Sequence, residues 1–105
     1  YAARSGVALP SSQGHVYWNN ALIATLAPGD YNVHTFTADV IVVVGTNTLS
    51  IQGAGTSDGN GLGIDNVQLV RVGSSENIVI NGGFERPAQN GAWKYYAGIE
   101  GWSTD

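Results

Sequence analysis

Residues 53–70 read GAGTSDGNGLGIDNVQLV, and this stretch carries the strongest structural signal in the chain. Five of its first eleven residues are glycines, at positions 53, 55, 59, 61 and 63, so the backbone can bend sharply there. Residues 64–70 then alternate between apolar and polar side chains, which is typical of a half-buried β-strand. The stretch therefore predicts a glycine loop that leads into a strand.

The composition of the whole chain favours strands and turns over helices. The chain has 105 residues, enough for one small domain, and only 11% of them are charged. Glycine, serine, threonine and asparagine are abundant, and β-branched residues crowd the middle of the chain. We therefore expect an all-β protein.

Alternating apolar residues predict further strands before the glycine loop. The expected strands are residues 15–18, 21–26, 31–44 and 48–52, with Asn19 and Asn20 as a two-residue hairpin turn because asparagine tolerates positive φ. Residues 40–44, which we call the valine segment, are apolar at every position. This pattern predicts a central strand that is covered on both faces.

Two patterns resemble the two ends of one domain type. The pattern G-x-G-T-S-D-G-x-G-L-x-I-D-N-V-x-L of residues 53–69 resembles the closing segment of jelly-roll, galactose-binding-like β-sandwich domains, which occur as repeats in large secreted or surface proteins. NIVINGGFERP at 77–87, with WKYY at 93–96 and IEGW at 99–102, resembles the opening segment of the same domain. The resemblance implies an antiparallel jelly-roll β-sandwich, either incomplete or completed by neighbouring subunits.

The order of these patterns predicts the domain organisation, because the closing segment precedes the opening segment. We expect residues 1–73 to be the C-terminal part of one sandwich, residues 74–76 to be a linker, and residues 77–105 to open the next repeat. The chain is then expected to be a piece of a longer tandem-repeat protein.

Charge and residue content argue against several classes of partner and chemistry. The net charge is −4 and only four residues are basic, Arg4, Arg71, Arg86 and Lys94, so we expect no binding to nucleic acid. The valine segment is far shorter than the roughly 20 residues that span a bilayer, so we expect no membrane insertion. No serine, histidine and acid stand in a recognisable catalytic arrangement, and the chain has no cysteine. We therefore expect a protein that is not an enzyme.

Side-chain oxygens in the glycine-rich stretch suggest a weak calcium site. Asp58, Asn60 and Asp65 supply oxygens at close spacing, which hard cations prefer, although the spacing departs from an EF-hand loop. Galactose-binding-like sandwiches often hold a structural calcium, so the resemblance is compatible with a structural calcium here but assigns no ligands to it. The interpretation that we prefer is turn chemistry, in which Asp58 caps a glycine turn while Asp65 and Asn66 form backbone hydrogen bonds where the predicted strand begins.

Aromatic residues suggest a second kind of site, a surface for sugar rings. The candidates are Tyr17, Trp18, Trp93, Tyr95 and Trp102. Aromatic rings stack on the apolar faces of sugars, while neighbouring Asn and Asp side chains bind hydroxyl groups. Adjacent aromatics on a strand point to opposite faces, so one ring of each adjacent pair is expected to be exposed. The alternative is that each ring fills a core.

These observations lead to one expected function and two alternatives. The first is a non-catalytic structural and interaction module of a tandem-repeat surface or filament protein, located outside the cell or on its surface, with neighbouring repeats or identical subunits as partners. The second is a carbohydrate-binding module whose partners are glycans. The third is an accessory domain of a larger enzyme.

Overall fold

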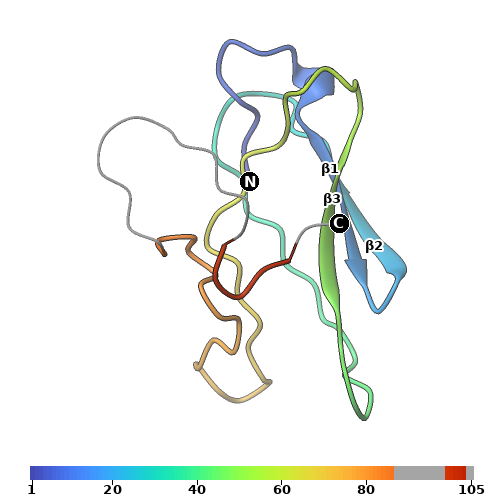
Figure 1. Ribbon diagram of the computed structural model, residues 1–105, viewed down its shortest axis with the longest axis vertical. Coiled ribbons are helices and arrows are strands. Elements are labelled where there is room, and N and C mark those ends of the chain that lie inside the picture. Colours follow the sequence, from blue (N-terminus) through green and yellow to red (C-terminus); the bar gives the residue numbers. More distant parts are fainter. Residues whose placement is uncertain (87–98, 104–105) are drawn as a thin grey trace. The chain divides into compact units, whose positions relative to one another are not determined.

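The computed structural model describes residues 1–86 and 99–103, and their contacts form two compact units (Figure 1). The first unit is Tyr1–Ile64 and the second is Asp65–Asp105. The regular structure of the described residues is a three-stranded antiparallel sheet and one short 3-10 turn, η1 (Leu9–Ser11). The chain is therefore an all-β protein, as its composition predicts.

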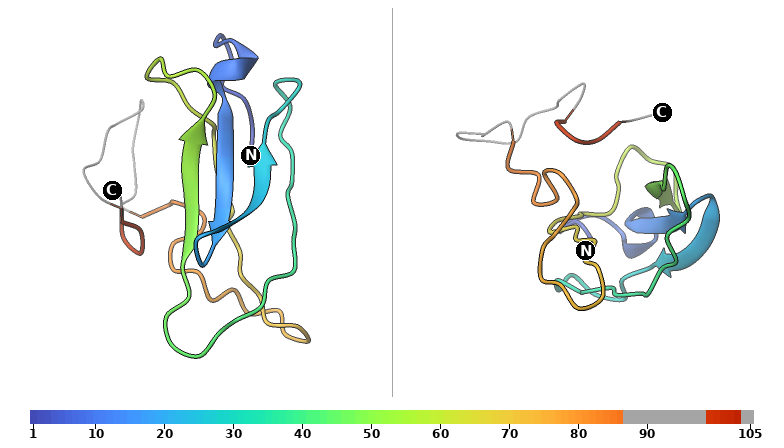
Figure 2. Two further views of the ribbon diagram at one scale, coloured as in Figure 1. Left: turned by 90° about the vertical axis from the view of Figure 1, so that its right-hand side faces the viewer. Right: turned by 90° about the horizontal axis from the view of Figure 1, so that it is seen from below.

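The sheet lies in the first unit and has the strand order β2-β1-β3. Its strands are β1 (Gln13–Trp18), β2 (Ala21–Leu26) and β3 (Leu49–Ala54), and β1 is antiparallel to both neighbours. Figure 2 shows β1 between the other two strands. The long connection between β2 and β3 contains no strand.

The predicted hairpin is confirmed, since β1 and β2 are joined by a two-residue turn at Asn19 and Asn20. Both residues have positive φ, 48° and 68°, which is the backbone conformation that this kind of hairpin turn requires. The register shifts between Val16 and Tyr17, because Val16 pairs with Ala24 whereas Tyr17 pairs with Leu22. Ile23 is therefore the extra residue of a β-bulge.

The predicted strand at residues 48–52 is also confirmed, as β3, which begins one residue later and extends to Ala54. It pairs with β1 without a shift, from Gln13 opposite Ala54 to Trp18 opposite Leu49. Alternation was sufficient to predict β3 as a strand, but not that it pairs with β1.

The core of the first unit is small and lies on one face of β1. Burial alternates along this strand, and Gly14, Val16 and Trp18 are buried. Leu26 of β2, Ala3 and Pro28 are also buried. A single sheet has only one layer with which to cover apolar side chains, so the remaining apolar residues are partly or fully exposed.

The prediction of a strand at residues 31–44 is wrong. These residues form no strand, and the valine segment is exposed rather than covered on both faces. The exposed fractions are 84% for Ile41, 63% for Val42, 53% for Val43 and 105% for Val44. A strand that is apolar on both faces needs a hydrogen-bonded neighbour and two covering layers, and the described residues supply neither.

The prediction of a strand at residues 64–70 is also wrong. The stretch has single bridges at its ends, Ala2 with Gly63 and Val70 with Asn77. Asn66 lies at a φ of 52°, which interrupts the extended backbone. The side chain of Asn77 accepts a hydrogen bond from Leu69 N at 2.9 Å, where a neighbouring strand would supply a backbone carbonyl. Residues 77–80 likewise form no strand beyond the single bridge at Asn77.

Backbone contacts hold residues 67–69 against residues 78–82 in the second unit. Val67 N donates to Gly82 O at 2.8 Å, and Ile78 N donates to Leu69 O at 3.0 Å. Gly82 is buried, and a Cβ atom there would collide with the carbonyl oxygen of Val67. This close approach explains why glycine is needed at position 82.

Candidate functional site

Trp18, a candidate sugar-stacking residue, serves packing in this structure. Its side chain lies on the buried face of β1 and is 8% exposed. The indole Nε1 donates to the carbonyl oxygen of Ile41 at 2.9 Å. Trp18 therefore presents no open ring face. Its side chain instead binds the backbone of the valine segment at Ile41.

Tyr17 lies on the opposite face of β1 and is half-buried, as the alternation of a strand predicts. Its ring meets the ring of His15 edge-on at a centroid distance of 6.2 Å. Among the described residues, Tyr17 is the candidate aromatic on the sheet that keeps part of its ring accessible.

Trp102 lies in the second unit and is half-buried. Its ring packs on that of Phe84 at a centroid distance of 5.0 Å, and its Nε1 donates to Asn81 O at 3.2 Å. The other two aromatic candidates, Trp93 and Tyr95, lie outside the described residues. Of the predicted aromatic surface, the described residues thus contain Tyr17 and Trp18 in the first unit and Trp102 in the second.

Asp58 and Asn60, two of the calcium candidates, are joined by a turn in the glycine loop. The Asp58 carboxylate accepts a hydrogen bond from Asn60 N at 3.0 Å and another from the hydroxyl of Ser11. The Ser11 hydroxyl, followed by the Asn60 amide, holds the pKa of Asp58 below the usual range of an aspartate. The carboxylate is therefore ionised at neutral pH, with both oxygens already accepting hydrogen bonds.

Asp65, the third calcium candidate, lies in the second unit. Its carboxylate accepts a hydrogen bond from the neighbouring amide of Asn66 at 2.7 Å. Within the described part of the chain, no group of three or more His, Cys, Asp or Glu side chains is arranged to hold a metal ion. The calcium site stays a prediction from the sequence.

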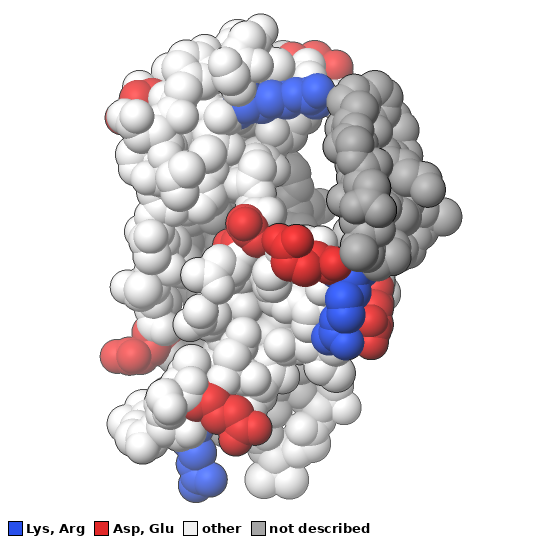
Figure 3. Space-filling view, turned by 90° about the vertical axis from the view of Figure 1, so that its left-hand side faces the viewer, with Lys and Arg blue, Asp and Glu red and all other residues white. Residues whose placement is uncertain are grey.

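Charged side chains of the described residues are sparse. Figure 3 shows the basic side chains singly on the face that it presents, rather than gathered in a patch. In the second unit Arg86 forms an exposed ion pair with Glu100, at 3.3 Å between Nη1 and Oε1.

The most distinctive feature of the first unit is the valine segment, because its side chains are exposed while its backbone is held. Asn47 accepts a hydrogen bond from Val43 N and donates one to Val43 O, both at 2.9 Å. Asn19, in the hairpin turn, donates to the Asn47 side chain at 3.0 Å. Together with the bond from Trp18 to Ile41, these contacts attach the segment to the β1-β2 hairpin and leave its apolar side chains facing solvent.

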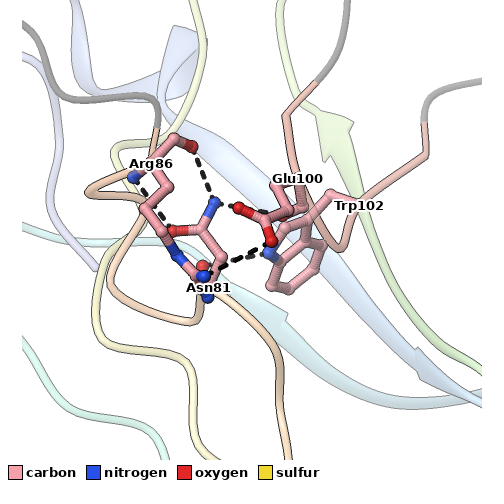
Figure 4. Close-up of polar contacts among 4 residues, drawn as sticks. All are labelled: Asn81, Arg86, Glu100 and Trp102. Atoms are coloured by element: carbon pink, nitrogen blue, oxygen red, sulfur yellow. Dashed lines mark hydrogen bonds and ion pairs between the residues drawn. The ribbon is translucent and has the colours of Figure 1, made fainter.

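In the second unit, Asn81, which is 9% exposed, makes several polar contacts through its side chain. Its side-chain nitrogen donates to the carbonyl oxygens of Arg86, at 2.8 Å, and Glu100, at 3.0 Å. Its side-chain oxygen accepts from Arg86 N at 3.1 Å. Figure 4 shows Asn81 between Arg86 and the segment of Glu100 and Trp102. Asn81 therefore joins two stretches that are well separated along the chain.

Sequence reasoning did not identify the roles of Asn47 and Asn81. Asparagine carries both a donor and an acceptor, so it can replace a backbone partner where a strand ends or turns. The available signal was an asparagine beside glycine or between turn residues, as in Asn81-Gly82-Gly83. That signal predicts a turn, but it does not name the distant carbonyl groups that the amide binds.

The fold defines the chain as an all-β protein with an open three-stranded sheet. No protein-family model matches the chain, and no curated protein or solved structure matches it either. Among the described residues, no helix has both the length and the apolar composition needed to cross a bilayer.

Proposed function

We propose that this chain is a non-catalytic structural and interaction module that assembles with neighbouring copies of itself. In this proposal, copies complete each other's sheets by adding strands, as repeats do in a filament or a surface coat. The complete module would be a jelly-roll sandwich of the galactose-binding-like type in an extracellular tandem-repeat protein. The residue patterns at 53–69 and 77–87 support that finer assignment.

The exposure of the valine segment is the observation that carries the proposal. Four consecutive apolar residues from Ile41 to Val44 are each more than half exposed. Contiguous exposed apolar surface of this kind marks interaction sites in soluble proteins. β-Branched residues in an extended stretch also favour pairing with another strand.

The open sheet supports the same proposal. β2 and β3 are both edge strands, and neither has a further strand beside it among the described residues. The exposed edge of a sheet offers unpaired N–H and C=O groups to another chain. A neighbouring copy is thus a suitable partner for the sheet as well as for the valine segment.

The charge distribution favours a copy of the same chain as the partner. Residues 40–57 contain no Asp, Glu, Lys, Arg or His, although the chain as a whole has a net charge of −4. Two copies that approach through this uncharged stretch bring no like charges together within it. Elsewhere on the chain, acidic side chains would repel each other.

Sedimentation velocity over a range of protein concentrations tests the proposal. We expect reversible dimers or larger assemblies for the natural sequence, and loss of association in Val42→Lys, which places like charges at the contact. Val33→Lys is the matched control because Val33 is 83% exposed and lies outside the valine segment. It should associate like the natural sequence.

Two results would contradict this function. If the chain remains monomeric at all concentrations, it does not assemble with copies of itself and the proposed function is wrong. Binding to a glycan array that Trp102→Ala abolishes, without self-association, would favour the carbohydrate-binding alternative instead.

A further inference from the structure

The backbone of the valine segment uses one side for contacts within its own unit. Residues 33–43 run without a turn or bend, and the chain bends at Val44 and Gly45. Ile41 O accepts a hydrogen bond from Trp18, and Val43 N and Val43 O both bind the Asn47 side chain. In an extended chain the N–H and C=O of alternate residues point to opposite sides. Residues 41 and 43 therefore face the hairpin, and their neighbours face away from it.

The outward side of the segment carries the backbone groups of Val40 and Val42. Within the described part of the chain, neither residue has a backbone hydrogen-bond partner. His34 lies earlier in the same extended stretch, and its backbone groups point to the same side as those of Val40 and Val42. There His34 N donates to Tyr1 O at 2.8 Å, and Tyr1 N donates to His34 O at 2.7 Å. This reciprocal exchange is the pattern of a hydrogen-bonded pair in an antiparallel ladder.

We infer that the valine segments of two copies pair antiparallel, with Val42 of one copy opposite Val42 of the other. This inference rests on the proposed function and specifies its contact. Val42 N–H of each copy donates to Val42 O of the other, and Val40 of each lies opposite Val44. Association through these outward groups breaks no hydrogen bond to Trp18 or Asn47.

Charge at the end of the segment favours the antiparallel direction over the parallel one. Asp39 precedes the segment and Gly45 follows it. A parallel, in-register pair would place the two Asp39 carboxylates side by side, where like charges destabilise a sheet. In the antiparallel pair each Asp39 lies opposite Gly45 of the second copy, so the carboxylates are at opposite ends of the contact.

Cysteine cross-linking of the full chain tests this register, and the natural sequence has no cysteine to interfere. A hydrogen-bonded antiparallel pair separates Cα atoms by about 5.5 Å, which lies within the range that a disulfide spans. Under mild oxidation, Val42→Cys should form covalent dimers roughly tenfold faster than a collisional background, because pairing raises the local thiol concentration. Val33→Cys measures that background, because Val33 is 83% exposed against 63% for Val42 and so is no less accessible to collisions.

Variants at the two ends of the segment determine the direction of pairing. Val40→Cys alone and Val44→Cys alone should cross-link near the background rate, whereas a mixture of the two should cross-link as fast as Val42→Cys. Equal cross-linking by all three single variants would overturn the antiparallel register. If sedimentation finds dimers that none of these variants cross-links, the inference is overturned while the proposed function stands. A monomeric chain would overturn both.

Discussion

Asparagine side chains take over backbone roles at several points of this chain. Asn19 accepts a hydrogen bond from Thr48 N at 2.7 Å, and Asn81 binds backbone groups on two separate stretches. Asn19, Asn20, Asn66 and Asn81 also lie at positive φ, where most other residues are strained. The abundance of asparagine therefore reflects turn geometry as much as surface polarity.

Replacing Asn81 by Asp should loosen the second unit. The variant keeps the size of the side chain but loses both N–H donors, and it turns a carboxylate toward the carbonyl oxygens of Arg86 and Glu100. We expect the free energy of local opening to fall by about 2 kcal/mol or more, as for buried acceptors left without partners. Hydrogen exchange at the amide of Arg86, which donates to the Asn81 side chain, measures this change.

Asn60→Asp is the control for that substitution, because Asn60 is exposed and its own side chain holds no backbone group in the described structure. Its effect on exchange at Arg86 should be negligible. Equal exchange rates in Asn81→Asp and in the natural sequence would contradict the role assigned to Asn81.

The Ser11 hydroxyl should make the titration of Asp58 sensitive to substitution. Because the folded pKa of Asp58 is lowered, its contribution to stability is complete above the ordinary aspartate value of about 3.9. That contribution is lost as the pH falls through the lower folded pKa. In Ser11→Ala the pKa of Asp58 should rise toward the ordinary value, which an NMR titration of the carboxyl carbon detects. Ser57→Ala, an exposed neighbour, should leave it in place, and an unshifted pKa in Ser11→Ala would refute this cause.

Strands and turns that are marked by a local residue pattern were predictable from the sequence. Whether a segment finds a second strand to pair with was not. The β1-β2 hairpin follows from alternation around Asn19 and Asn20, and β3 follows from the alternation that includes Leu49 and Ile51. Residues 31–44 carry an equally strong strand pattern, but a strand forms only where another backbone accepts its hydrogen bonds. Sequence pattern alone therefore could not reveal that the valine segment has no partner strand within the described part of its own chain.

The candidate site was predictable only in part for the same reason. The alternation of β1 indicated that Tyr17 and Trp18 face opposite ways, but it did not indicate which ring is buried. The bond from Trp18 to Ile41 joins residues well apart in sequence, so no local pattern encodes it. The contribution of Asn47 depends on the same long-range arrangement.

The hairpin turn offers a test at the scale of an element. Asn20→Gly should stabilise the first unit by about 0.5 kcal/mol, because glycine adopts positive φ without the strain of a side chain. Asn19→Gly should instead destabilise it by about 1–2 kcal/mol, since it removes the bonds to Thr48 N and Asn47. Urea denaturation followed by circular dichroism compares the two variants. The same sign for both would contradict the separate roles of the two asparagines.

At the scale of the whole molecule, a small core makes the proposed association of copies measurable as a change in stability. The buried apolar side chains of the first unit are few, whereas many large apolar side chains are exposed. If copies pair, binding stabilises the folded state by mass action. The midpoint of thermal unfolding should then rise by roughly 5 °C for a hundredfold increase in protein concentration. Calorimetry of Val42→Lys should find a midpoint that does not change with concentration, and a constant midpoint in both proteins would contradict the link.

The uncovered side chains of the valine segment also affect how this chain can be handled at the bench. Fluorescent dyes such as ANS bind apolar surface and usually report loss of tertiary packing. Here the folded monomer already offers such surface at Ile41 and Val44. Dilute native samples should therefore show strong ANS fluorescence before heating begins. The fluorescence per mole of protein should fall as the protein is concentrated.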